Sequence, residues 1–335
     1  MREKGNEQLK KWNRYERKWR WRNFYFHKVL RQHIFEKYFH YDIVMPRYAG
    51  KWVADKKTTN DWIAEKIESG EPFMVARFGN TELQLTISVL QERIKGVTRE
   101  SRERFDKWFG RLGEGAGFFP NDEQLAERFT DLLIDSCKQT DLLAMWHCYM
   151  EDYIISEYIP DVKLTYLTRI EPWRYKNPWT RCLKGKKVLV IHPFEDSIKK
   201  QYKKREYLFP NPNILPEFEL LTLKAVQTIA GAKDERFKDW FEALEYMYNQ
   251  AMMINFDIAI IGCGAYGMPL AAMLKEAGKQ VIHLGGATQL LFGIKGKRWV
   301  DSPMVKIDFN EEWVYPMASE TPQFSNKVED NCYWK

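Results

Sequence analysis

Short apolar runs rich in β-branched residues alternate along the chain with amphipathic stretches of helical spacing. The apolar runs cover residues 73–78, 141–146, 163–168, 188–191, 258–261 and 281–284. Helical patterns occupy residues 61–69, 81–94, 122–138, 151–158 and 236–253, while residues 218–226 fit a strand and a helix equally well. This alternation predicts an α/β fold with a doubly wound, mainly parallel sheet that helices cover on both faces.

The pattern divides the 335 residues into three parts. Residues 1–45 form a basic, aromatic helical arm, residues 46–303 a single α/β domain, and residues 304–335 an irregular C-terminal tail that we expect to pack on that domain. A chain of this length is long enough to bury a sizeable core.

The arm carries the excess positive charge of the chain. It holds twelve Lys and Arg against five Asp and Glu, whereas the whole chain has a net charge of +6. Trp12, Tyr15, Trp19 and Arg22 follow helical spacing. A basic aromatic helix suits the surface of an anionic membrane, but it also suits packing on the main domain, pairing with a second copy, or binding nucleic acid, which we consider the weakest of these.

Cysteine usage bears on the compartment. The five cysteines form no CxxC pair, so we expect neither a disulfide framework nor a zinc knuckle. The first forty residues are charged throughout and show no signal peptide. We therefore expect a cytoplasmic protein, peripheral on the inner face of the membrane if the arm binds lipid.

In parallel sheets, ligands bind outside the carboxyl ends of the strands. His147, His192 and His283 each follow a predicted strand, and so does the glycine-rich segment 262–267. The sequence therefore concentrates imidazole, carboxylate and glycine at one edge of the sheet, as an active site would.

The spacing Gly262-x-Gly264-x-x-Gly267 matches the turn that binds dinucleotides. The helix after such a turn presents free N–H groups and a positive dipole end to a phosphate. The next strand, however, ends in His283-Leu284 without the carboxylate that would hold a ribose. The glycines indicate a nucleotide or phosphate crevice, or only close packing of a helix on a strand.

Another candidate segment follows the strand at 73–78. Asn80 and Glu82 offer oxygen ligands for Mg²⁺ or Mn²⁺, although the same residues could simply cap a helix and favour its first turn. Arg77 and Gly79 precede them, and Arg77 could face a phosphate or pair with a carboxylate.

Other candidates lie later in the chain. His192 or Asp196 could be the general base, or they could be a backbone-bonded imidazole and a helix cap. Tyr266 could stack on a base or sugar, or fill the crevice. Lys297 and Arg298 could neutralise a diphosphate, although basic loops are usually only solvated.

The segment Ala76-Arg77-Phe78-Gly79-Asn80-Thr81-Glu82-Leu83 resembles the R-x-G-D-G-E segment of the GT-D-type glycosyltransferases, a bacterial Rossmann-like family first catalogued as a domain of unknown function. Further similarity extends over residues 60–335, including the long segment from Ile260 to Trp299. In that family a D-x-E triplet is associated with a divalent metal and the diphosphate of a nucleotide sugar. Glu82 matches its acid, but Asn80 stands where Asp is expected, so metal-independent transfer is an alternative.

The resemblance implies a glycosyltransferase, of hexosyltransferase type and divalent-metal assisted. It would move a sugar from a nucleotide diphosphate sugar to a hydroxyl of a cell-surface glycan or lipid-linked acceptor. Two other functions remain open from the residues alone. One is an NAD(P)- or flavin-dependent oxidoreductase that uses the glycine turn, and the other is a non-catalytic protein that binds membrane or nucleic acid through the arm.

Overall fold

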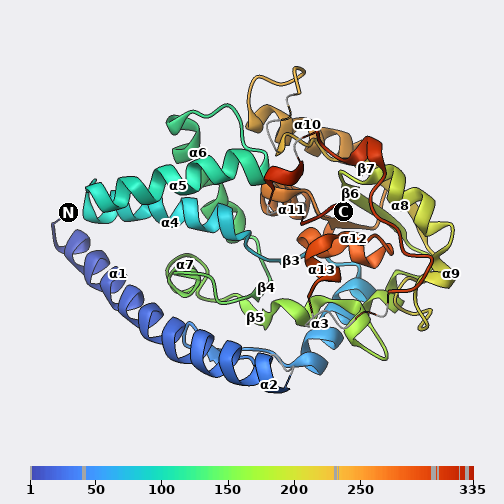
Figure 1. Cartoon of the computed structure of the whole chain (residues 1–335), viewed down its shortest axis with the longest axis horizontal. Helices are drawn as coiled ribbons and strands as arrows, with labels where there is room; N and C mark the ends of the chain where they lie inside the picture. The colour runs from blue at the N-terminus through green and yellow to red at the C-terminus, as the bar shows by residue number, and fades with distance from the viewer. Residues whose placement is uncertain are drawn as a thin grey trace.

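The computed structural model describes residues 2–39, 43–229, 232, 234–302, 307, 309–323, 325–328 and 332–335. Its centre is a seven-stranded sheet in the order β5-β4-β3-β9-β8-β6-β7, and every strand pair in it is parallel (Figure 1). The strands are β3 (Phe73–Ala76), β4 (Leu142–Met145), β5 (Lys163–Tyr166), β6 (Lys187–His192), β7 (Glu219–Lys224), β8 (Ile258–Ile261) and β9 (Gln280–His283).

The six predicted strands are therefore confirmed, and the ambiguous segment 218–226 contains β7. This strand lies at the edge of the sheet and none of its residues is fully buried. An edge strand needs no continuous apolar run of the kind that marks the buried strands, which is why this segment is ambiguous in the sequence. A separate two-stranded hairpin, β1 (Arg47–Tyr48) and β2 (Lys51–Trp52), precedes the sheet.

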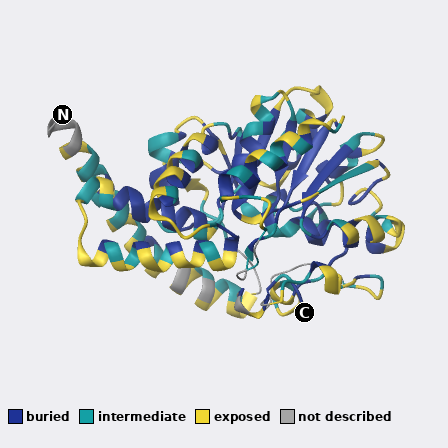
Figure 2. Ribbon diagram, turned by 90° about the horizontal axis from the view of Figure 1, so that it is seen from above, coloured by how far each residue is buried: buried dark blue, intermediate teal, exposed yellow. Residues whose placement is uncertain are grey.

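Helices cover both faces of the sheet, which confirms the doubly wound α/β class. Figure 2 shows the buried strands between layers of helices. Alternate strand residues point to opposite faces, so Met74 and Ala76 join one apolar cluster while Phe73 and Val75 join the other. The helices of the sheet domain are α3 (Lys56–Ser69), α4 (Asn80–Lys95), α5 (Arg99–Ala116), α6 (Glu123–Cys137), α7 (Glu151–Tyr158), α8 (Glu195–Tyr202), α9 (Arg205–Leu208), α10 (Trp240–Met252), α11 (Gly267–Glu276), α12 (Thr288–Leu291) and α13 (Lys297–Val300).

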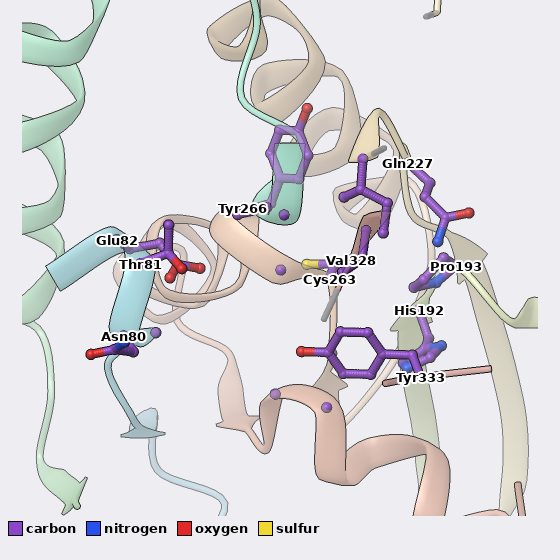
Figure 3. Close-up of a pocket in the computed structure, with 18 of the residues that line it drawn as sticks. Asn80, Thr81, Glu82, His192, Pro193, Gln227, Cys263, Tyr266, Val328 and Tyr333 are labelled. Carbon is purple, nitrogen blue, oxygen red and sulfur yellow. The ribbon is translucent and has the colours of Figure 1, made fainter. Parts of the chain in front are cut away.

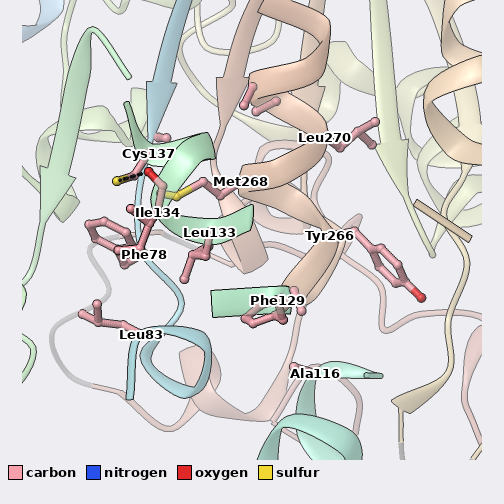
Figure 4. Packing of buried hydrophobic residues seen from close by; sticks show 14 of the residues in the cluster. Phe78, Leu83, Ala116, Phe129, Leu133, Ile134, Cys137, Tyr266, Met268 and Leu270 are labelled. Carbon is pink, nitrogen blue, oxygen red and sulfur yellow. Dashed lines mark hydrogen bonds between the residues drawn. The ribbon is translucent and has the colours of Figure 1, made fainter. Parts of the chain in front are cut away.

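The first cluster joins helices that are far apart in sequence. Phe78, Leu83, Phe129 and Met268 come from the end of β3, α4, α6 and α11, and they pack together in Figure 4. The charged, glycine-bearing segment 98–120 contains α5, which continues to Ala116. This helix ends only where Gly117 adopts a left-handed φ of 80°.

The arm is one long helical segment, which begins as α1 (Arg2–Arg22), continues as the π-helical η1 (Asn23–Glu36) and ends as α2 (Lys37–Phe39). The face with predicted helical spacing packs on the main domain. Trp12 is fully buried, with its ring 4.9 Å from that of Tyr153 on α7, and the Tyr15 hydroxyl lies 2.6 Å from Ser156 Oγ. No helix in the described ranges is both long and apolar enough to cross a bilayer.

A buried ion pair ties the arm to α7. Arg22 Nη1 lies 2.8 Å from Asp152 Oδ2, and the two side chains are 9% and 2% exposed. The Arg22 guanidinium also lies 4.8 Å from the ring centroid of Tyr48. Removing one member of such a pair leaves the other charge buried without compensation, which is strongly destabilising.

We expect Arg22→Met to lower the free energy of unfolding by about 2–4 kcal/mol, because Asp152 keeps its buried position but loses its partner. The matched control is Lys138→Met, which breaks the exposed pair with Asp135 and should cost less than about 1 kcal/mol. Urea denaturation followed by tryptophan fluorescence measures both. Equal losses in the two variants would show that the buried pair does not hold the arm.

Candidate functional site

A cavity of about 470 Å³ lies at the carboxyl ends of β3, β9, β8 and β6, which are adjacent in the sheet. Figure 3 shows Glu82 and His192, from segments after these strands, around one space together with Tyr333 from the C-terminal tail. Most of the predicted site residues line this cavity: Arg77, Gly79, Asn80, Glu82, His192, Gly262, Gly264, Tyr266 and Arg298.

Arg77 is held between two neighbouring loops. Its guanidinium carbon lies 5.1 Å from the centroid of the Trp146 ring, in a cation–π arrangement. On its other side, Gly285 has a left-handed φ of 62°, and a Cβ atom there would come within 3.1 Å of Arg77 Nη1. The glycine thus leaves room for the Arg77 side chain, which lines the cavity.

The first turn of α4 forms one wall of the cavity. Gly79 is its N-cap and no side chain caps it, so Asn80 does not act as the cap. The Glu82 carboxylate folds back over Gly79, because a Cβ atom at position 79 would lie only 1.9 Å from Glu82 Oε2. Asn80 is exposed, and in Figure 3 its side chain points away from His192 and Tyr333.

These residues do not fit a resident metal ion. Among the residues that the structure describes, no three His, Cys, Asp or Glu side chains are grouped to hold one. Within the described part of the chain, Glu82 and the exposed Glu114 are the carboxylates that line the cavity. Mg²⁺ commonly binds through one or two carboxylates together with substrate phosphates, so any ion here would depend on a bound diphosphate.

The glycine-rich turn after β8 combines two functions. Gly264 has a left-handed φ of 58° and makes the turn at the edge of the cavity. Gly267 lies outside the cavity lining and allows close packing, since a Cβ atom there would lie 2.1 Å from His283 Cε1. The turn leads into α11, so the N-termini of α4 and α11 both lie at the cavity and favour an anion there.

His192 and His283 are buried in the cavity wall. Burial lowers the pKa of each imidazole to about 3, and for His283 the nearby Arg77 adds to the effect. His192 Nδ1 accepts the N–H of Phe194 at 3.0 Å. The neutral ring therefore carries its proton on Nε2 and can donate a hydrogen bond, an arrangement that favours binding an anion over acting as a general base.

Three predicted residues have other surroundings. The Tyr266 ring is almost fully buried and stacks on Trp240, with centroids 4.7 Å apart, so it fills the core beside the cavity. Asp196 is exposed and lies outside the cavity lining. Its backbone N–H donates to the Glu320 carboxylate of the tail at 2.8 Å. Lys297 is also exposed outside the lining, and its N–H donates to the Trp334 carbonyl.

The sequence reasoning missed several residues of the cavity wall. Trp146 is the last residue of the predicted strand 141–146, and because β4 ends at Met145 it lies at the carboxyl end, where the same rule could have found it. The remaining residues come from the second half of α5, from the segment that follows the edge strand β7, and from the irregular tail, and none of them is among the residues predicted from the sequence. They include Trp108, Arg111, Gln227, Thr228, Ile229, Val328, Tyr333 and Trp334.

A buried carboxylate supports the loop that carries Trp146. Glu151 Oε2 accepts the backbone N–H groups of Trp146 at 3.3 Å and of Cys148 at 3.1 Å. Burial raises the pKa of Glu151 to about 7, although these hydrogen bonds act in the opposite direction. The loop geometry therefore depends on a side chain that changes charge near neutral pH.

Comparison with known proteins gives little support for a function. No family model and no curated protein matches the chain. One similar chain is described as the selenomethionine-substituted structure of domain of unknown function 1792; it has 13% identity and a TM-score of 0.41, covering 78% of this chain and 94% of that one. Another similar chain has 12% identity and a TM-score of 0.39, and the match covers 78% of this chain and 98% of that one. Its description states that this highly conserved domain has a distinct glycosyltransferase fold. Identities and TM-scores this low do not assign a function.

We expect Glu151→Gln to change the pH dependence of stability. The raised pKa means that the folded wild type holds a proton that the unfolded chain releases, so wild-type stability is full below about pH 4.5 and falls as pH rises through about 7. Relative to the variant, the wild type should lose roughly 2–3 kcal/mol between about pH 5 and about pH 8.

Urea unfolding of both proteins at the two pH values measures this difference. Glu103→Gln is the control, because Glu103 lies in an exposed pair with Arg99 and should give the same small change at both pH values. A difference between wild type and Glu151→Gln that does not vary with pH would contradict the prediction.

Proposed function

We propose that the protein is a glycosyltransferase that moves a sugar from a nucleotide diphosphate sugar to a hydroxyl of a cell-surface glycan or glycolipid. The observation that carries this proposal is the single cavity at the carboxyl ends of four central parallel strands, with two helix N-termini and the cations Arg77 and Arg298 around it. Such surroundings favour a diphosphate. The resemblance of residues 76–83 and 260–299 to GT-D-type enzymes points the same way.

The residues have distinct proposed roles. Arg77, the Nε2–H group of His192 and the N-termini of α4 and α11 would bind the diphosphate and stabilise its charge as it departs. Trp146 and Gly285 restrain the arginine before the substrate arrives. Arg298 reaches the same cavity from α13, and its Nη1 donates to the Tyr333 hydroxyl at 3.2 Å.

Glu82 is the proposed carboxylate for the acceptor side of the reaction. It lines the cavity at the start of α4, whereas Asp196 lies outside it and His192 is arranged as a donor. Mn²⁺ or Mg²⁺, if it enters with the donor, would be bound by the diphosphate oxygens and would supply further positive charge there. The roles given to the chain's own residues do not require that ion.

Nucleotide sugars should stabilise the protein against heat, and Arg77→Gln should weaken the best of them roughly tenfold to a hundredfold, because one charge-assisted contact to the diphosphate is lost. The measurement is the shift of Tm over a panel of nucleotide sugars, with Mn²⁺ and with chelator. We expect a larger shift with Mn²⁺, since an ion carried by the diphosphate would add positive charge in the cavity.

Arg99→Gln is the matched control, because this arginine is 93% exposed at the opposite end of α5 and should leave the shift unchanged. If no nucleotide sugar raises Tm or is hydrolysed by the wild type, the glycosyltransferase proposal is wrong.

We also propose that the arm holds the enzyme on an anionic membrane surface, at the inner face of a cytoplasmic membrane. The side opposite Trp12 and Arg22 presents Trp21, Phe24 and Tyr25, which are 64%, 55% and 52% exposed. Their rings contact one another at centroid distances of 5.0 Å. The same helical face carries the following exposed cations: Lys10, Arg14, Arg17 and Lys18. Cations together with interfacial aromatic rings are typical of helices that lie on anionic lipid.

The double variant Trp21→Ser/Phe24→Ser should bind phosphatidylserine-containing vesicles about tenfold more weakly than the wild type, because the two exposed rings no longer enter the lipid interface. Co-sedimentation with vesicles of phosphatidylcholine, with and without phosphatidylserine, measures this. Tyr207→Ser removes an aromatic ring that is 67% exposed on α9 and should have no effect. Equal binding by the double variant would exclude this face as the membrane contact.

A further inference from the structure

A second, larger depression lies beside the cavity, at the carboxyl ends of β4 and β5. We call it the basic groove; its volume is about 930 Å³, and its walls include Arg31, Lys57, Tyr166, Trp173 and Arg174. Because β4 is the neighbour of β3 in the sheet, the groove continues the edge at which the cavity lies. Trp146 and Arg298 line both spaces.

Charge distinguishes the groove from an ordinary surface depression. Of the residues that the structure describes, Asp55 and Glu171 are the carboxylates in its lining. Outside it, Glu36 pairs with Arg31 and Asp61 with Lys57, so positive groups still exceed negative ones when these are included. The lining cations are Arg31, Lys56, Lys57, Arg169, Arg174 and Arg298. An anionic ligand suits this excess.

Aromatic side chains provide the second feature. Trp146, Tyr166, Trp173 and Trp299 lie among the cations of the groove. Trp146, Trp173 and Trp299 are partly exposed, so their rings can pack on a sugar. Partly exposed rings beside cations that can bind a phosphate point to a phosphate-bearing saccharide.

We propose that the basic groove is the acceptor site and that it binds a saccharide bearing phosphate. This inference rests on the proposed function, because the cavity beside it must hold the donor. The acceptor hydroxyl would pass Trp146 and reach the donor sugar. Its oxygen forms a bond to the anomeric carbon, the bond from that carbon to the diphosphate oxygen breaks, and the acceptor proton goes to a base such as Glu82 while the nucleoside diphosphate leaves.

The groove opens beside the arm. Arg31, on η1, lines it, and the guanidinium carbon of Arg31 lies 5.8 Å from the Tyr166 ring centroid. A phosphate-bearing saccharide could be linked through diphosphate to a lipid in the membrane, or it could be a free phosphorylated glycan. Both sources share the sugar and the phosphate that the groove would recognise, so the experiment must separate them.

The experiment measures binding by titration calorimetry with the donor cavity filled by whichever nucleoside diphosphate stabilises the protein best. The probes are glucose 1-phosphate, neutral methyl glucoside, a farnesyl diphosphate-linked monosaccharide and a phosphorylated oligosaccharide. We expect the phosphorylated probes to bind and the neutral glycoside to bind at least about tenfold more weakly. Added salt should weaken binding of the phosphorylated probes, as for a solvent-accessible charged site.

The test variant is Lys56→Gln/Lys57→Gln, at the exposed start of α3, where the Lys57 side chain is 88% exposed. It should bind the phosphorylated probes about tenfold more weakly and keep the Tm shift that the nucleoside diphosphate produces. Lys138→Gln removes a similarly paired surface lysine on the opposite side of the domain and should bind like the wild type. The lipid-linked probe binding tighter than the oligosaccharide would identify a lipid source, and the reverse order a free glycan.

The acceptor-site proposal is overturned if the wild type binds no phosphorylated probe, or if the lysine variant binds these probes as the wild type does. It is also overturned if an RNA oligomer binds more tightly than every saccharide and depends on the same lysines. Failure of the proposed function looks different: no nucleotide would shift Tm, whatever happens to the saccharides.

Discussion

The parallel direction of the strands is the constraint on which the rest of the structure depends. When every strand of a sheet points the same way, each connection returns over a face, and every segment that follows a strand lies at the same edge. Here that edge collects the ends of β3, β9, β8 and β6 around one cavity and the ends of β4 and β5 around the basic groove. Residues more than a hundred positions apart, such as Glu82 and His192, therefore share one space.

Burial at this edge determines the chemistry that the residues can perform. His192 and His283 lie in the wall at 3% exposure, so both remain neutral near pH 7. The Arg77 guanidinium lies beside them and is restrained by Trp146. The cavity thus presents a fixed cation, neutral imidazole rings and helix N-termini. Together these groups favour binding of a substrate that carries an anionic group.

The arm, the groove and the cavity adjoin one another in the structure. One face of the arm is buried through Trp12 and the Arg22–Asp152 pair, while the other presents Trp21 and its neighbours to the surroundings. Arg31 on the same helical segment belongs to the wall of the groove, and Trp146 lines both the groove and the cavity. In the function that we propose, these contacts would bring a membrane surface, an acceptor and a donor to adjoining places.

The sequence by itself determined the alternation of strands and helices, the parallel doubly wound class and the edge where polar residues would meet, because periodicity and chain direction are local properties. Only the tertiary structure decided which residues at this edge remain accessible to a ligand. Gly267 packs against His283, Tyr266 stacks on Trp240, and Glu320 accepts a hydrogen bond from the backbone N–H of Asp196. The irregular tail likewise supplied Tyr333 and Trp334 to the cavity without any pattern that marks them. Each of these outcomes depends on a contact between segments distant in the chain, and no local spacing encodes such a contact.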